Sequence, residues 1–214
     1  MKREKHSTIK LLLTTLFVSC LIISNIIAAK QIQLPFNLIM PAAVILFPVT
    51  YILSDIFSEV YGYKWSRITN YLGIAFNLLA VLAFTAAIKI TPSPFYENQE
   101  AFSAILGSTP KILIASTLGL WLGDFLNDNV FKIMKKKYAD SHDKYGARAI
   151  LSSLVGEIGD SLVFIPIVFY GAMPVEVMIK MVFTQAFLKV AYEIIILPIS
   201  KRIMLKVSEY EVKQ

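Results

Sequence analysis

Phe47-Pro-Val-Thr-Tyr-Ile-Leu-Ser-Asp-Ile-Phe-Ser-Glu-Val-Tyr-Gly62 is the stretch that decides how this sequence folds. It continues an apolar run and then places Asp55 and Glu59 four residues apart. On a helix, this spacing puts both carboxylates on one face, one turn apart. Because the segment is typical of the inner end of a membrane crossing, where ionisable groups are costly, the pair predicts a polar path or binding face inside a membrane protein.

The composition supports this interpretation. The chain has 214 residues, of which 56% are hydrophobic and 17% are charged, and its mean hydropathy is +0.62. Soluble domains carry about 25% charged residues. A single cysteine, Cys20, excludes an intrachain disulfide framework, and the two histidines, His6 and His142, lie outside the apolar runs. We therefore expect neither a metal site nor a cofactor.

Six apolar segments are long enough to cross a bilayer as helices. They cover approximately residues 10–29, 38–60, 68–90, 111–130, 149–170 and 175–199. The sequence thus predicts an all-α integral membrane protein, a single transmembrane domain over residues 1–214 folded as a compact bundle of six transmembrane helices. A cleaved signal peptide is the alternative for the first segment, but residues 11–29 form a longer run than a typical signal-peptide core.

The distribution of basic residues predicts the orientation of the bundle. Most lysines and arginines lie in segments 1–10, 61–67, 132–148 and 200–214, and the intervening connections hold few. By the positive-inside rule, both termini are cytoplasmic and the protein is multi-pass in the cell (inner) membrane. This placement, more than the net charge of +6, argues against direct binding of nucleic acid. The connection 91–110 is expected to be the longest external loop.

Small residues recur at four-residue spacing in the fourth and fifth segments. They are Ala115, Gly119 and Gly123 in the fourth, and Ser152 and Gly156 in the fifth. Small side chains at this spacing let helix backbones approach closely inside a membrane. The pattern predicts tight bundle packing and says nothing about a ligand.

Polar side chains inside the predicted segments are the candidates for function, because such groups normally face the bundle interior and mark a substrate or ion path. The candidate substrate-binding residues are Asp160, Glu157, Lys189, Glu193, Gln185, Asp124, Asn77 and Asn25, and the candidates for a gate or path are Asp55, Glu59 and Tyr51. The alternative is that single pairs, such as Lys189 with Glu193, only tie helices together.

The chemistry of this set suits a small planar solute. Carboxylates accept pairs of hydrogen bonds, amides both donate and accept, and nearby aromatic rings can stack on a planar ligand. A cation or proton path is an alternative that composition alone leaves open. The sequence contains no GxxxxGK[ST], GxSxG or HExxH pattern, so we expect a protein that is not an enzyme and whose transport is passive, ion-coupled or driven by a separate partner.

Residues 47–63 resemble the signature of the queuosine precursor transporter family. Further stretches agree with the family's pattern in the same order, namely residues 24–30, 123–127, 160–164, 169–171 and 189–193. The resemblance implies a six-helix bacterial inner-membrane importer of queuosine precursors for modification of transfer RNA. Where the family's pattern has Gln, this chain has Glu157 and Asp124, so the resemblance leaves open the 7-cyano base, the cationic 7-aminomethyl base or queuine.

A deazaguanine presents a ring N–H and an exocyclic amine side by side, which one carboxylate can accept as a bidentate pair. The resemblance thus implies that Asp160 or Glu157 reads this edge, that Asp55 and Glu59 line the cytoplasmic half of the path, and that Lys189 pairs with Glu193 or donates to the ring carbonyl. Two other classes stay open: the substrate-binding subunit of an ATP-driven vitamin-type importer, and a non-transport membrane assembly protein. A homo-oligomer is also open.

Overall fold

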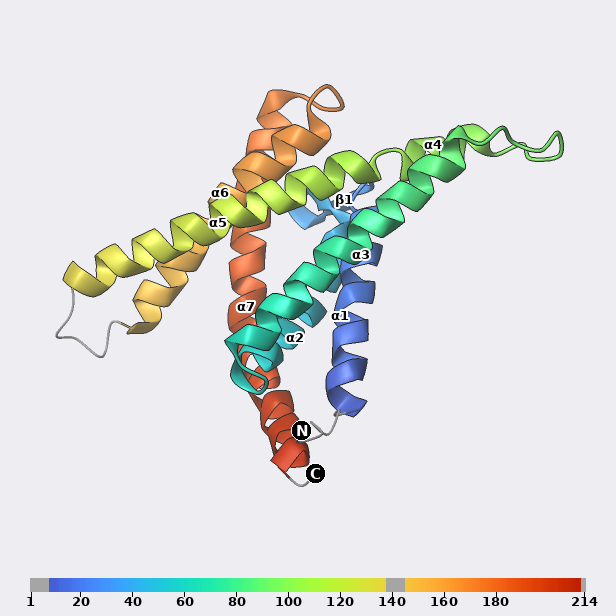
Figure 1. Cartoon of the computed structure of the whole chain (residues 1–214). Helices are drawn as coiled ribbons and strands as arrows, with labels where there is room; N and C mark the ends of the chain where they lie inside the picture. The colour runs from blue at the N-terminus through green and yellow to red at the C-terminus, as the bar shows by residue number, and fades with distance from the viewer. Residues whose placement is uncertain (1–7, 138–144, 213–214) are drawn as a thin grey trace.

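The computed structural model describes residues 8–137 and 145–212. In chain order the elements are α1 (Thr8–Ile27), β1 (Gln31–Leu34), η1 (Pro35–Asn37), β2 (Leu38–Pro41), η2 (Ala42–Leu46), α2 (Phe47–Glu59), α3 (Tyr63–Lys89), α4 (Gln99–Leu106), α5 (Thr109–Lys137), α6 (Tyr145–Phe169) and α7 (Val175–Val212) (Figure 1). Parts of the predicted basic segments 1–10 and 132–148, with both histidines, lie outside the described residues.

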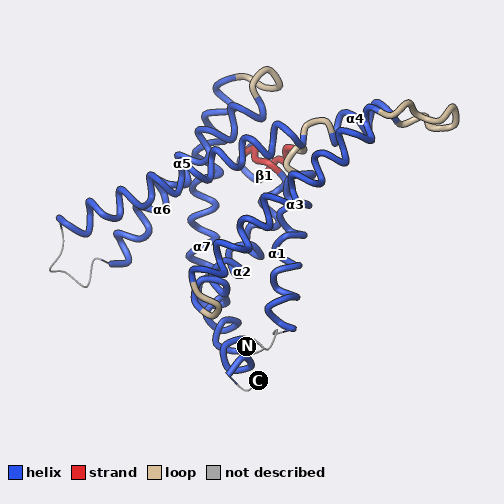
Figure 2. Tube along the Cα trace, viewed as in Figure 1, coloured by secondary structure: helices blue, strands red, loops and turns tan. Residues whose placement is uncertain are grey.

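The prediction of an all-α membrane protein is confirmed. Within the described residues, five helical segments are long and apolar enough to cross a bilayer: Thr8–Ile27, Tyr63–Lys89, Gln99–Met134, Ile150–Phe169 and Val175–Glu211. Helix α2 is the sixth member of the bundle and is shorter, with 13 residues. Strands are confined to one small hairpin (Figure 2).

The sequence predicted a helix that begins at residue 38, but the structure shows no α-helix there. Residues Leu38–Pro41 form β2 and Ala42–Leu46 form the 3₁₀ helix η2, so the α-helix starts only at Phe47. Two prolines explain the change: Pro41 ends the strand, and Pro48 occupies the first turn of α2, where its missing N–H is tolerated. A rise of about 2 Å per residue over η2 and about 1.5 Å over α2 still spans about 30 Å, the thickness of the hydrocarbon core.

The hairpin that replaces the start of this helix turns at its tip through two left-handed residues. Strands β1 and β2 pair antiparallel, with Gln31 opposite Pro41 and Leu34 opposite Leu38. Phe36 and Asn37 have φ values of 65° and 57°, and Gln33 Nε2 donates a 2.8 Å hydrogen bond to Asn37 Oδ1 across the turn. Non-helical backbone of this kind occurs at membrane depth only where protein or water forms hydrogen bonds with its N–H and C=O groups.

Further boundaries also differ from the sequence prediction: α3 begins earlier, at Tyr63, and α5 ends later, at Lys137. The connection 91–110 contains the short helix α4, and α7 continues beyond residue 199 to Val212 as one helix of 38 residues. At about 1.5 Å per residue α7 is about 57 Å long, far more than a bilayer core requires. The segment expected as a C-terminal tail is therefore largely helical.

The start of α1, the turn between α2 and α3 and the end of α7 meet at one end of the bundle, which we call the terminus side (Figure 1). There Lys10 Nζ lies 3.7 Å from the centroid of the Trp65 ring, and Tyr61 donates a 2.7 Å hydrogen bond to Glu211 Oε1. The hairpin and α4 lie at the opposite end, the hairpin side. The chain runs along the bundle an even number of times, so its two ends lie on the same side.

Apolar side chains are concentrated towards both ends of the bundle. On the hairpin side, the buried cluster comprises Ala28, Ala43, Ile112, Ala115, Phe164, Ile165, Phe169, Met178, Met181 and Val182. On the terminus side, Phe17, Leu53 and Phe57 form a smaller cluster, in which the rings of Phe17 and Phe57 meet edge to face at 5.5 Å. Along α7, the buried polar residues Gln185 and Lys189 follow the residues of the hairpin-side cluster.

Helices α5 and α6 make the most extensive contact between any two elements. It depends on glycine, as the four-residue spacing of small residues predicted. A Cβ at Gly123 would lie 2.9 Å from the Gly156 carbonyl oxygen and 3.2 Å from Asp160 Cβ, and one at Gly156 would lie 2.9 Å from Asn127 Cβ. Real side chains do not fit at these distances, so the two backbones can pack this closely only with glycine.

Replacing Gly123 by leucine should separate α5 from α6. Overpacking of a tight core costs about 1–3 kcal/mol, and here the obstacle is backbone, so we expect a lower midpoint of thermal unfolding in detergent. The matched control is Thr117→Leu, which enlarges an exposed position on the same helix and should leave the midpoint near wild type. Equal midpoints for the two variants would contradict the packing described here.

Candidate functional site

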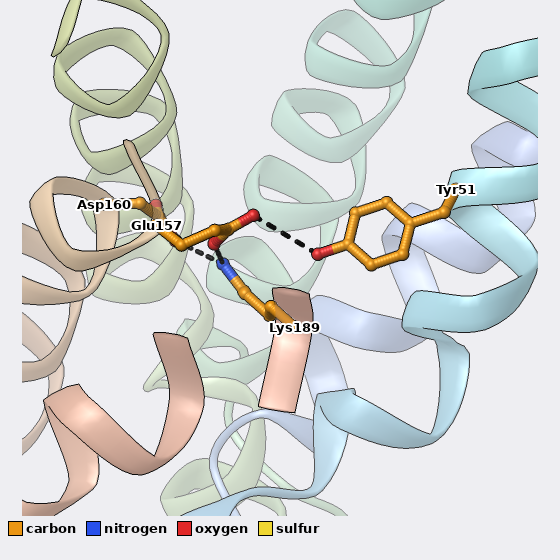
Figure 3. A network of polar contacts seen from close by, with 4 residues as sticks. All are labelled: Tyr51, Glu157, Asp160 and Lys189. Carbon is orange, nitrogen blue, oxygen red and sulfur yellow. Dashed lines mark hydrogen bonds and ion pairs between the residues drawn. The ribbon is translucent and has the colours of Figure 1, made fainter. Parts of the chain in front are cut away.

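The centre of the site is a buried lysine between two carboxylates (Figure 3). Lys189 Nζ, on α7, lies 2.7 Å from Glu157 Oε2 and forms a second ion pair with Asp160, both on α6. The side chains of Lys189, Glu157 and Asp160 are only 10%, 22% and 17% exposed. Glu157 and Asp160 share one face of α6 because they are three residues apart. The three groups together carry a formal charge of −1.

Helices α2 and α5 complete the surroundings of this ion triad. Tyr51 of α2 donates a 3.3 Å hydrogen bond to Glu157 Oε1 (Figure 3). On the other side, Gly119 of α5 lies against the Asp160 carboxylate, which would collide with any side chain at that position. Tyr51, predicted from the sequence as part of a gate or path, is thus a direct partner of the triad.

The structure corrects the expected partner of Lys189. The sequence paired it with Glu193, one turn away on the same helix, but its ion pairs run to α6 instead. Glu193 is exposed and lies within electrostatic reach of Glu157 and Asp55. Two carboxylates on the neighbouring helix neutralise a buried ammonium better than one exposed carboxylate on its own helix, because burial strengthens their attraction.

Asp55, the deeper residue of the acidic pair on α2, is held by α7. Its Oδ2 accepts a 2.6 Å hydrogen bond from Ser200 Oγ. Glu59, one turn later, is exposed at the end of α2. Ser200 was not predicted from the sequence. It follows Glu193 by seven residues and so lies on the same face of α7, and this spacing could have indicated it.

Two buried polar atoms lie unpaired beside the triad. Gln185 Oε1 and Ser161 Oγ have no hydrogen-bond partner within the described part of the chain. Gln185 precedes Lys189 by one turn on α7, and Ser161 follows Glu157 by one turn on α6. Because the two helices run antiparallel, both residues lie on the hairpin side of the triad. An unpaired buried polar group costs about 1–3 kcal/mol, so this layer is a natural position for a hydrogen-bonding ligand or an ordered water.

Asn25 and Asn77, also predicted as binding residues, form a separate contact. Asn25 Nδ2 donates a 2.6 Å hydrogen bond to Asn77 Oδ1, and Asn77 Nδ2 donates to the Gly73 carbonyl at 3.0 Å. The first bond joins α1 to α3, the second lies within α3, and neither reaches the triad. Amides that satisfy each other across two membrane helices contribute to packing, so in this structure the pair serves helix association.

Asp124 lies on α5 and is exposed. It is within electrostatic reach of Asp160 and Glu157. It lines a groove that opens on the outside of the triad. Over the described residues, no group of three or more His, Cys, Asp and Glu side chains is arranged to hold a metal ion. The site therefore offers an acidic surface, one buried ammonium and unpaired hydrogen-bonding atoms to an organic ligand.

Comparison with known proteins gives two matches. Residues 41–203 match the model of a family described as "Putative vitamin uptake transporter". The chain is also 21% identical over 175 residues to the "Probable queuosine precursor transporter" of Bacillus subtilis (strain 168), which covers 82% of this chain and 76% of that protein. No solved structure matches the chain.

Removing the ammonium of the triad should be strongly destabilising. In Lys189→Met two buried carboxylates lose their counterion, and loss of one partner of a buried pair costs about 3–5 kcal/mol. The triple variant Lys189→Met/Glu157→Gln/Asp160→Asn is neutral and should regain most of this stability. Thermal unfolding in detergent measures both, with Lys180→Met, an exposed lysine on α7, as the control. A single variant as stable as the triple variant would contradict the ion triad.

Proposed function

Because this chain belongs to the family of queuosine precursor and vitamin uptake transporters, we propose that it imports deazaguanine precursors of queuosine for the modification of transfer RNA. The substrates are 7-cyano-7-deazaguanine, its 7-aminomethyl counterpart or queuine. Both termini are cytoplasmic in this proposal, and the substrate passes from the hairpin side to the terminus side.

The observation that carries the proposal is the ion triad with its unpaired neighbours. A deazaguanine has a ring N–H and an exocyclic amine on one edge, and each carboxylate of the triad can accept that pair. When the base binds, Lys189 releases one carboxylate to it and stays paired with the other. The hydrogen bonds from the base to this carboxylate are also charge-assisted, because their acceptor oxygens are ionised. Exchanging one ion pair of Lys189 for these bonds therefore costs little free energy.

The layer around Gln185 and Ser161 supports the same ligand. The Gln185 amide oxygen is an unpaired acceptor, and a purine-like base carries a further ring N–H for it. Lys189 can donate to the ring carbonyl of the base. The site therefore offers hydrogen-bond acceptors and a donor to two sides of a planar molecule. A lipid or a bare metal ion could not form these hydrogen bonds.

Growth of a queuosine precursor auxotroph tests the proposal directly. Cells that cannot make the deazaguanine core should contain queuosine in their transfer RNA only when this gene is expressed and the base is supplied at low concentration. A host lacking any vitamin-type ATP-driven energy module separates a stand-alone importer from a substrate-binding subunit. Equal queuosine content with and without the gene would refute the proposal.

Uptake of labelled base by variants tests the assigned residues. Asp160→Asn and Glu193→Gln should both impair transport, and loss of a charge-assisted bond in the first predicts an affinity lower by about tenfold or more. Near-normal transport by both variants, correctly inserted, would overturn the assignment.

Gln185→Met separates ligand binding from folding. It removes an unpaired acceptor, so stability should be unchanged or higher, while KM should rise about tenfold because one hydrogen bond to the base is lost. Gln31→Met, at an exposed position of the hairpin, is the matched control and should leave KM unchanged. A lower stability with an unchanged KM would show that Gln185 has a structural role only.

A further inference from the structure

A groove of about 450 Å³ lies between the start of α3 and the second half of α5. Tyr63 lines it from α3, and Trp121, Asp124, Phe125 and Asn127 line it from α5. Its volume falls within the range of about 300–1,000 Å³ that is typical of sites for small organic ligands. Figure 1 shows α3 and α5 diverging towards this part of the molecule.

The aromatic side chains of the groove are largely exposed. Trp121 and Phe125 are 71% and 57% exposed, and their rings lie nearly parallel, with an interplanar angle of 20° and centroids 6.4 Å apart. Tyr63 is also exposed, at 74%. Aromatic faces bind planar heterocyclic bases by stacking, with little dependence on which base is bound.

Asp124 adds an acceptor beside these rings. It lies on a helix long and apolar enough to cross the membrane, and a carboxylate at such a position is costly against lipid. The groove must therefore hold water or a polar ligand next to it. A carboxylate beside stacked aromatic rings is a suitable receptor for a planar molecule with adjacent N–H donors.

The groove and the ion triad lie on different faces of α5, because Trp121 and Phe125 point away from the face on which Gly119 and Gly123 pack against Asp160. Asp124 follows Gly123, whose backbone packs against Asp160, and the groove extends from there for two turns to Lys132, which pairs with Asp128 at 3.8 Å on the exposed rim.

We propose that this groove is a second binding position for a planar base with N–H donors, which stacks on Trp121 while Asp124 accepts its N–H pair. This inference rests on the proposed function, because the ligand of the groove is the transported substrate.

Trp121 itself reports the binding. In the full-length Trp65→Phe variant, Trp121 is the only tryptophan, and phenylalanine keeps an aromatic platform under Lys10. Titration of the purified variant with 7-cyano-7-deazaguanine should quench its fluorescence to saturation, after correction against free tryptophan at equal absorbance. Adding Asp124→Asn should weaken the affinity about tenfold or more, whereas adding Lys189→Met/Glu157→Gln/Asp160→Asn should leave the quenching within about threefold.

Three results would overturn the inference. The first is the absence of saturable quenching in a Trp65→Phe protein that still supplies queuosine precursors to cells, which would refute the groove and not the transport function. The second is quenching that disappears with the neutral triad and is indifferent to Asp124→Asn. The third is a high yield of disulfide between copies in membranes through Phe125→Cys in a Cys20→Ser background, because a second copy would then cover the groove.

Discussion

The structure depends on the requirement that Lys189 be neutralised inside a membrane. An uncompensated ammonium there is expensive, and Glu157 and Asp160 on the neighbouring helix supply the compensation. Helices α6 and α7 must therefore keep one register, and Tyr51 extends the constraint to α2. The triad has one carboxylate more than it needs for neutrality, so it keeps a formal negative charge inside the bundle.

Glycine connects this electrostatic requirement to the packing of the bundle. Asp160 lies against α5 because Gly119 and Gly123 carry no side chains. The four-residue spacing of small residues, which indicates only close packing when read from the sequence, is thus also what brings a third helix to the ion triad. The same close packing puts Asp124 of α5 within electrostatic reach of the triad. The glycines that determine the helix packing therefore also determine which charges surround the triad.

Sequence reasoning predicted the features that depend on local pattern. Hydropathy indicated the helical membrane bundle, and residue type and spacing singled out Glu157, Asp160 and Lys189. It failed where the outcome depends on contacts between distant segments. The packing of α6 on α7 determines the partner of Lys189. The bond from Ser200 to Asp55 joins residues far apart in the chain. The late start of α2 accompanies a hairpin in which residues 38–41 pair with residues 31–34.

Helix α7 contributes to every level of the molecule. Met178, Met181 and Val182 belong to the hairpin-side cluster, Lys189 is the middle of the site, and Glu211 is tied to Tyr61 at the opposite end. Pro198 removes one backbone hydrogen bond from this helix, so the helix bends most easily there. Because Pro198 lies between Lys189 and Glu211, a bend at this position would move the Glu211 end of α7 without moving the residues of the hairpin-side cluster.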